Sequence, residues 1–487
     1  MQSLKALYLD SVRRAVTETL LPELQTDMAR HRVDLINMIL SRMVVMESGL
    51  PGMLRNYWAG IAPKLDELNA SLPEDHPAVA TLDSLAAQLA LVPGEDVLVE
   101  DWDAQLAETM QLLLQMMKHQ PFENSKLLIT SLAVDEDVFR EAYERQIGNL
   151  MASKADVADS GEPPINDESV SAYLRQRFPE TAGIRAEQVT NVPGGRSKST
   201  IMFDMLADDG SVEQVVMRKD FPVNFLETAV VAEFPMLQIL ADQNAPVARP
   251  LWVETDSSHF GTPFMVSEKV AGKTAGNLFS VAEASRPAGL ELARVLAFFH
   301  SLDLDETGLA AHVQFGHSES AAHELVAYWY QRWKSGASTA SVILEAAFTW
   351  LHDRKDVVDI TRRLVHGDAG IHNLLIEGDH VTALVDWEFA HAGDAAEDLA
   401  YCRNYVRQFM DWDEFLEHYL ETGGPSVSPA QLDYWGVWAA VRNAVATNLA
   451  YKSYVSGEDR DLRVAAMGMN TYPKLLYNLA KALKGAN

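Results

Sequence analysis

The chain has 487 residues, of which 48% are hydrophobic and 22% are charged, a composition typical of a globular protein with roughly two to four domains. Its 40 Lys and Arg residues and 69 Asp and Glu residues give a net charge of −29, which disfavours binding to nucleic acid and to anionic membranes. The single cysteine, Cys402, excludes an intramolecular disulfide, and no apolar secretion signal follows Met1, so we expect a cytoplasmic protein.

Residues 1–152 are predicted to form an all-helical domain. Hydrophobic residues recur there at fourfold spacing, and Pro and Gly interrupt the pattern at residues 50–52 and 92–94. The sequence of this part contains no catalytic constellation. We therefore expect an interaction or scaffold module that packs on the rest of the chain, forms a homodimer or binds a protein partner. The acidic, turn-rich residues 153–166 are predicted to be a linker.

A helix that opens at Asn166 and strands at residues 189–192, 201–205 and 215–220 are predicted next. Between the first two strands, Gly194 and Gly195 would let the backbone approach phosphate oxygens closely, and Ser197 follows them. On its own, a glycine pair between strands is typical of an ordinary hairpin. The segment matches neither a Walker A loop nor a Gly-x-Gly-x-x-Gly fingerprint.

An acidic chain that binds a nucleotide must gather its cations locally, and Arg196, Lys198, Arg218 and Lys219 provide such a group. Side chains alternate along a strand, so Arg218 and Lys219 cannot both face the same ligand. Glu233 lies in the helical segment that follows, where it is either the acid that pairs with the chosen cation or an ordinary surface residue.

Residues 364–388 form the most informative segment. Asp368 is followed by Asn373 five positions later and by Asp386 after another thirteen, with two short predicted strands and a turn between the last two. Phosphoryl transfer from ATP requires a carboxylate that accepts the hydroxyl proton, and magnesium requires oxygen ligands. Asp368 is the candidate base, and Asn373 and Asp386 are the candidate magnesium ligands. A single Asp in a turn commonly caps backbone N–H groups, but here several spacings agree with a kinase catalytic loop.

These residues resemble the aminoglycoside phosphotransferase and choline kinase-like family. Residues 366–373 resemble the family's His-Gly-Asp loop with Asn five residues after the Asp, and residues 386–388 resemble its Asp-aromatic-acidic motif. Residues 391–400 resemble the family's Gly-Asp-Pro-x-x-Asp-Leu-Ala segment, with Ala395 in place of the Pro. The resemblance gives Asp398 a scaffold role.

The resemblance implies a bilobal, protein-kinase-like α+β fold after the all-α domain, with a mostly β N-lobe at residues 167–272 and a mostly α C-lobe at residues 273–487. It is closest to kinase-like domains associated with acyl-CoA dehydrogenases, in which Arg often replaces the strand Lys. We therefore favour Arg218 over Lys219 as the cation that contacts the phosphates. Main-chain atoms of Glu268 and Val270 are expected to bind the adenine.

The implied function is an ATP- and Mg²⁺-dependent O-phosphotransferase that phosphorylates a hydroxyl of a small molecule, such as a catabolic alcohol or a hydroxyacyl-CoA. The C-terminal helices and the helical insert at about residues 282–350 would form the acceptor wall, where Trp435 and Trp438 either line the pocket or belong to the core. One alternative substrate is an aminoglycoside or another antibiotic. A second alternative is a pseudokinase scaffold, against which the intact Asp368, Asn373 and Asp386 argue.

Overall fold

The computed structural model describes residues 27–48, 50–73, 75–91, 99–117, 165–181, 183–192, 198–221, 228–276, 284–336, 340–456 and 467–486, together with a few single residues. The predicted linker lies almost entirely outside the described residues. The chain divides into two compact units. The helical unit contains residues 1–161, 329–356 and 440–487, and the sheet unit contains residues 162–328 and 357–439. The domain boundaries expected from the sequence stay predictions.

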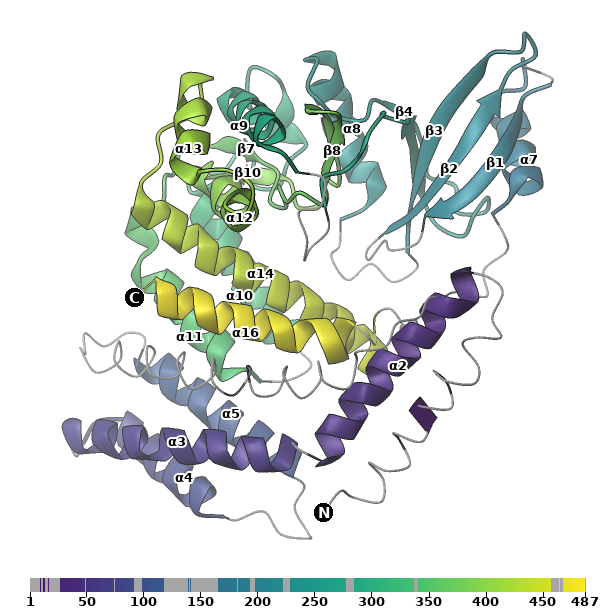
Figure 1. Ribbon diagram of the computed structural model, residues 1–487. Helices are drawn as coiled ribbons and strands as arrows, with labels where there is room; N and C mark the ends of the chain where they lie inside the picture. The colour runs from purple at the N-terminus through teal and green to yellow at the C-terminus, as the bar shows by residue number, and fades with distance from the viewer. Residues whose placement is uncertain are drawn as a thin grey trace. The chain divides into compact units, whose positions relative to one another are not determined.

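The first part of the sheet unit is a five-stranded antiparallel sheet in the order β1-β2-β3-β5-β4. Strands β1 to β4 are labelled in Figure 1. Its strands are β1 (Arg185–Val192), β2 (Lys198–Leu206), β3 (Val212–Asp220), β4 (Pro250–Glu254) and β5 (Phe264–Glu268). Helix α7 (Asp167–Arg177) begins at Asn166, whose side chain accepts a hydrogen bond from the Ser169 N–H group in a capping box. The capped helix packs its apolar side against the sheet.

A buried hydrophobic core lies between α7 and one face of this sheet. Val170, Tyr173 and Leu174 of α7 meet alternate residues of β2 and β3, including Ile201, Phe203, Val215 and Met217. Helix α8 (Val230–Asp242) follows β3, and the Asp220 carboxylate accepts hydrogen bonds from the Val230 N–H group at the start of this helix. Because strand side chains alternate, β2 and β3 present their remaining residues to the opposite face.

The second part of the sheet unit contains two small sheets. Strand β7 (Arg363–Val365) pairs with β10 (His391–Gly393), and β6 (Lys273–Thr274), β8 (Leu374–Glu377) and β9 (His380–Leu384) form the other sheet. The predicted hairpin that precedes Asp386 is therefore present as β8 and β9. Helices α9 (Arg286–Ser301), α12 (Ala396–Val406) and α13 (Trp412–Glu421) complete this region. The first half of α10 (Ala321–Gly336), through Tyr328, and the start of α14 (Pro429–Val455), through Ala439, also belong to it.

The helical unit is built from segments that are distant in the sequence. Helices α2 (Asp27–Ser48), α3 (Leu50–Ser71), α4 (Ala78–Ala90) and α5 (Val99–Met117) come from the N-terminal part. Helices α11 (Val342–Asp353) and α16 (Tyr472–Gly485) and the short π-helix η5 (Met467–Thr471) come from later segments. Residues 50–52, where the sequence predicts a break, are instead helical and form the start of α3, with Pro51 in its first turn.

One hydrophobic core joins the N-terminal helices to α11. Val342 and Ala346 of α11 belong to the same buried cluster as Trp58, Leu106 and Leu113. Polar contacts continue the junction. The Gln111 side chain donates a hydrogen bond of 3.1 Å to the Ser341 carbonyl oxygen, and Gln115 donates one of 3.2 Å to Glu345. The N-terminal helices therefore complete a core to which the later helices also contribute.

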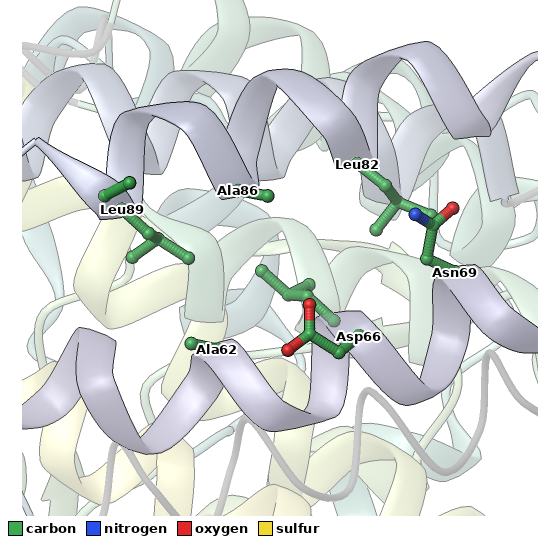
Figure 2. Close-up of a pocket in the computed structure, with 8 residues that line it drawn as sticks. Ala62, Asp66, Asn69, Leu82, Ala86 and Leu89 are labelled. Atoms are coloured by element: carbon green, nitrogen blue, oxygen red, sulfur yellow. The ribbon is translucent and has the colours of Figure 1, made fainter.

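Helices α3 and α4 leave a pocket of about 270 Å³ between them (Figure 2). Its walls are mostly Ala and Leu side chains, with Asp66 and Asn69 of α3 as the polar groups. None of the predicted site residues lines this pocket. Among the described helices, none is long and apolar enough to span a membrane.

Candidate active site

The loop between β7 and β8 carries Asp368. Gly367, which precedes it, has a φ of +79°, a conformation that glycine adopts without the strain of a side chain. The Asn373 amide nitrogen donates hydrogen bonds to the Asp368 main-chain oxygen at 3.0 Å and to its carboxylate Oδ2 at 2.9 Å. His372 Nε2 lies 3.2 Å from the same Oδ2. The loop thus fixes the orientation of the Asp368 carboxylate from two sides.

The fully buried Asp398 of α12 supports this loop through hydrogen bonds to its backbone. Its two carboxylate oxygens accept hydrogen bonds of 2.8 Å from the backbone N–H groups of His366 and Gly367. His300 of α9 lies 3.2 Å from Asp398 and 2.8 Å from the Tyr419 hydroxyl. Burial alone would raise the pKa of Asp398, but the hydrogen bond from His300 and the other donors outweigh it and lower that pKa. The expected scaffold role of Asp398 agrees with these contacts.

Asp386 follows β9 and lies next to the same loop. His366 Nε2 donates to the Val385 carbonyl oxygen at 3.1 Å, and the Val385 N–H group donates to the Asn373 carbonyl oxygen at 2.9 Å. Asp386 has a φ of +68°, a left-handed conformation that Asp tolerates better than most residues but that is uncommon outside turns and functional sites. The charge of Asp368 is close enough to influence the ionisation of Asp386.

Arg218 of β3 connects Asp386 to helix α8. Its guanidinium donates hydrogen bonds to the Asp386 carboxylate and, at 3.3 Å, to Glu233. Lys198, the first residue of β2, lies on the same face of the sheet, because Thr200 is paired with Arg218 in the strand register. The Lys198 ammonium is 2.8 Å from Glu233 and 2.7 Å from Glu388.

The charges in this cluster shift one another's pKa. Burial opposes the charged forms of Arg218 and Asp386, yet their mutual attraction raises the pKa of Arg218 and lowers that of Asp386. Burial likewise opposes the Lys198 ammonium, but Glu233 and Glu388 raise the pKa of Lys198 to about 12. Burial and the charge of Asp386 raise the pKa of Glu388 to about 7. The site therefore keeps both cations charged at neutral pH.

The remaining predicted residues are placed differently. Lys219 extends from the opposite face of β3, where its ammonium donates a hydrogen bond of 3.0 Å to the Phe260 carbonyl oxygen in the core beneath α7. Glu268 ends β5, and its N–H group donates to the Arg249 carbonyl oxygen, so an adenine contact from Glu268 would come from its own carbonyl oxygen. Val270 follows in the connection to β6. Gly194, Gly195 and Ser197 lie outside the described residues.

The sequence pattern places Lys198 among several local cations that would bind a nucleotide, and it indicates no separate role for Glu388 or His372. The pairing of β2 with β3 puts Lys198 on the same face as Arg218. Glu388 stood in the recognised motif without a partner, and His372 directly precedes Asn373. A register for the two strands would have been enough to find Lys198, whereas the partners of Glu388 and His372 depend on tertiary structure.

The donor set suits magnesium by its chemistry. Asp386 offers a carboxylate that is about one-third exposed, with 34% of its side-chain surface accessible. Asn373 engages Asp368 through its amide nitrogen, so its amide oxygen takes no part in that hydrogen bond. In the described ranges, no group of three or more His, Cys, Asp or Glu side chains is arranged to hold a metal ion. Magnesium would therefore take its other ligands from phosphate oxygens and water, as it commonly does.

The comparison with protein families identifies the fold to which this site belongs. Residues 189–440, just over half of the chain, match the model of the phosphotransferase enzyme family. The chain belongs to this family. The matched range contains all of the predicted site residues.

Individual relatives are distant. Acyl-CoA dehydrogenase family member 11 of Mus musculus is 29% identical over 245 residues, which cover 48% of this chain and 30% of that protein. A putative aminoglycoside phosphotransferase from Ralstonia eutropha is 20% identical with a TM-score of 0.49, over 65% of this chain and 98% of the other. A thermostable mutant of aminoglycoside phosphotransferase APH(4)-Ia, in complex with ADP and hygromycin B, is 17% identical with a TM-score of 0.42, over 63% and 98% of the two chains.

These findings confirm two predictions from the sequence: the family and the likeness to acyl-CoA dehydrogenase family members. The predicted α+β fold preceded by helices agrees with family membership and with the observed order of helices and strands. The match spans less than a third of the length of the curated relative.

Proposed function

We propose that this chain is an ATP- and Mg²⁺-dependent phosphotransferase that phosphorylates a hydroxyl of a small molecule. The observation that carries the proposal is the convergence of Asp368, Asn373 and Asp386 at one site within a chain of the phosphotransferase enzyme family. The presence of ADP in one solved family structure supports a purine nucleotide as the phosphate donor.

In the proposed reaction, the bond between the γ-phosphorus and the bridging oxygen of ATP breaks, and a bond from that phosphorus to the acceptor oxygen forms. Asp368 orients the acceptor hydroxyl and takes its proton as the new bond forms. Arg218 holds the phosphates of the nucleotide, and Glu233 positions the Arg218 guanidinium. When bound by Asn373 and Asp386, magnesium would neutralise charge on the triphosphate.

The surroundings of Asp368 support an acceptor without a high positive charge. His372 and Asn373 contact the Asp368 carboxylate, and Gly370 leaves room for the His372 ring, since a Cβ at Gly370 would lie 2.4 Å from that ring. Tyr401 and Tyr405 lie beyond it, with ring centroids 6.4 Å apart. Aromatic and amide groups suit a neutral alcohol or an acyl-CoA alcohol better than a polycationic antibiotic, which is the alternative substrate. Because Asp368, Asn373 and Asp386 are all present, a pseudokinase scaffold is the weaker alternative.

The test compares Asp368→Asn with Asp386→Asn. We expect Asp368→Asn to reduce phosphate transfer by about 10²–10⁴-fold while binding of Mg-ATP persists, because only the proton acceptor is lost. We expect Asp386→Asn to weaken binding of Mg-ATP itself. The measurements are ADP release with a panel of alcohols, hydroxyacyl-CoA compounds and antibiotics, and titration calorimetry with ATP in the presence and absence of Mg²⁺. Equal loss of nucleotide binding in both variants, or no ADP release with any acceptor, would contradict the proposal.

A further inference from the structure

Five charged side chains in the sheet unit form a row of alternating sign. In order they are Asp386, Arg218, Glu233, Lys198 and Glu388, and each contacts the next. The row starts and ends in the same tripeptide, because Asp386 and Glu388 are separated only by Trp387. We call this set the charge row. It contains two cations and three carboxyl groups, so it carries one net negative charge when all five side chains are ionised.

The two cations of the charge row differ in exposure. Arg218 and Asp386 are partly accessible, with 16% and 34% of their side-chain surface exposed. Lys198 has 2% of its side-chain surface exposed, and its partners Glu233 and Glu388 have 4% and 8%. A ligand that enters from solvent can therefore reach the Arg218 end, whereas the Lys198 end is enclosed by protein.

Glu233 uses a different oxygen for each cation. Its Oε1 lies 2.8 Å from the Lys198 ammonium, and its Oε2 accepts the bond from Arg218. If Arg218 moves toward another anion, Glu233 keeps one cationic partner. Without Lys198, the same movement would leave Glu233 and Glu388 as buried carboxylates that have lost their ammonium partner, which is strongly unfavourable.

We propose that Lys198 is a positioning residue that holds Glu233 and Glu388 while Arg218 exchanges Asp386 for a nucleotide phosphate. This inference rests on the proposed function, because it is the metal-bound nucleotide that would compete with Arg218 for Asp386. Lys198 acts through its two carboxylate partners and does not contact the nucleotide. Two residues on neighbouring strands therefore divide the work: Arg218 of β3 binds the phosphate, and Lys198 of β2 holds Glu233 of α8.

The experiment uses the full chain and the variants Lys198→Met, Glu388→Gln and the double variant with both changes. Titration calorimetry with ADP, with and without Mg²⁺, measures binding independently of transfer. We expect Lys198→Met to weaken Mg-ADP binding about tenfold. In the double variant, Glu388→Gln also removes the negative charge that Lys198 balances, so its binding should recover to within about threefold of the native chain. Tyr173→Phe, which removes a buried hydroxyl on the α7 face of the same sheet, controls for general loosening and should bind Mg-ADP like the native chain.

Steady-state kinetics give a second readout. A positioning role predicts that Lys198→Met changes KM for Mg-ATP more than kcat, and that Lys198→Arg restores part of the loss. Native-like binding by Lys198→Met would overturn the inference. A double variant as weak as Lys198→Met would also overturn it, because that result would place Lys198 on the nucleotide. If Lys198→Met does not fold, the double variant alone is compared with the native chain. Mg-ADP binding within about threefold of the native chain supports the inference, and weaker binding overturns it.

Failure of the proposed function gives a different result. In that case the native chain itself binds neither ATP nor ADP, and the inference about Lys198 fails with it. If the inference alone fails, the native chain still binds the nucleotide and transfers phosphate. In that case Lys198→Met either binds Mg-ADP like the native chain or is not rescued by Glu388→Gln.

Discussion

Asp386 and Asp398 both have a pKa below the ordinary value for aspartate, but their surroundings differ. Asp386 is partly exposed, has a left-handed backbone and depends on the cations Arg218 and Lys198. Asp398 is fully buried and depends on His300 and on two backbone N–H groups. A mobile ligand can replace a partly exposed cation, whereas it cannot replace backbone donors in the core. The comparison favours the proposed role of Asp386 in ligand exchange and agrees with the support of the loop by Asp398.

The largest expected contrast between these two aspartates is in stability. Asp398→Asn places an amide NH₂ group against one of two backbone N–H groups and leaves that donor without an acceptor. We expect a loss of about 3 kcal/mol in the free energy of unfolding. Asp386→Asn should cost about 1 kcal/mol or less, since its partner remains partly exposed. Urea unfolding of the two variants measures the difference. Similar losses in both would mean that Asp386 is also a structural residue.

A smaller loss of stability is expected at Tyr419, which supports the catalytic loop through His300 and Asp398. We call these three residues the support. The Tyr419 hydroxyl lies 2.8 Å from His300 Nδ1, and His300 in turn contacts Asp398. Tyr419→Phe removes this hydroxyl and should lower the free energy of unfolding by about 1 kcal/mol. Nucleotide affinity should stay unchanged, because the contact is two residues removed from the catalytic loop. A loss of ADP affinity measured by calorimetry would show that the support and the charge row are coupled.

The sequence predicted one of these two regions better than the other. Asp368, Asn373 and Asp386 follow fixed spacings along one loop and hairpin, so local pattern was sufficient to find them. The hairpin before Asp386 and the helix opened by Asn166 are also local and were predicted correctly. The side-chain partner of Asp398 is His300 of α9, with a sequence separation of 98 residues, and no local pattern indicates such a contact.

Long-range packing also sets the surroundings of the helices, which periodicity does not indicate. The helical pattern and the acidic residues 153–166 predict a separate domain at residues 1–152, and Val342 and Ala346 of α11 share a hydrophobic core with helices from that range. Trp435 and Trp438, considered for the acceptor wall, are fully buried and donate hydrogen bonds of 2.8 and 2.9 Å to Asp394 and Glu397. Indole rings serve an acceptor pocket or a core equally well, and only the position of their N–H groups distinguishes the two.

The smallest predicted effect concerns two buried histidines with opposite ionisation. His366 accepts from the Asp368 N–H group through Nδ1 and donates to the Val385 carbonyl oxygen through Nε2, so it is neutral, and burial lowers its pKa. His391 has an acceptor at each ring nitrogen, Phe389 O at 2.8 Å and Glu397 at 3.1 Å. Burial opposes its charged form, but Glu397 outweighs burial and raises the pKa of His391.

Because its folded-state pKa is raised, His391 contributes stability that is fully present below the unfolded value of about 6.5 and is lost as pH rises through the folded value. We expect the free energy of unfolding of the native chain to fall with pH above about 7, and this fall to be reduced in His391→Gln, whose amide can still donate to Glu397. Glu388 has a raised pKa of about 7 and adds a slope of the same sign below that pH, so the difference between native and variant curves above pH 7 isolates His391. Asp386→Asn should leave this difference unchanged, because the hydrogen bonds of His391 described above are made with Phe389 and Glu397 and not with Asp386. Parallel curves for the native chain and His391→Gln would show that His391 is neutral in the folded protein.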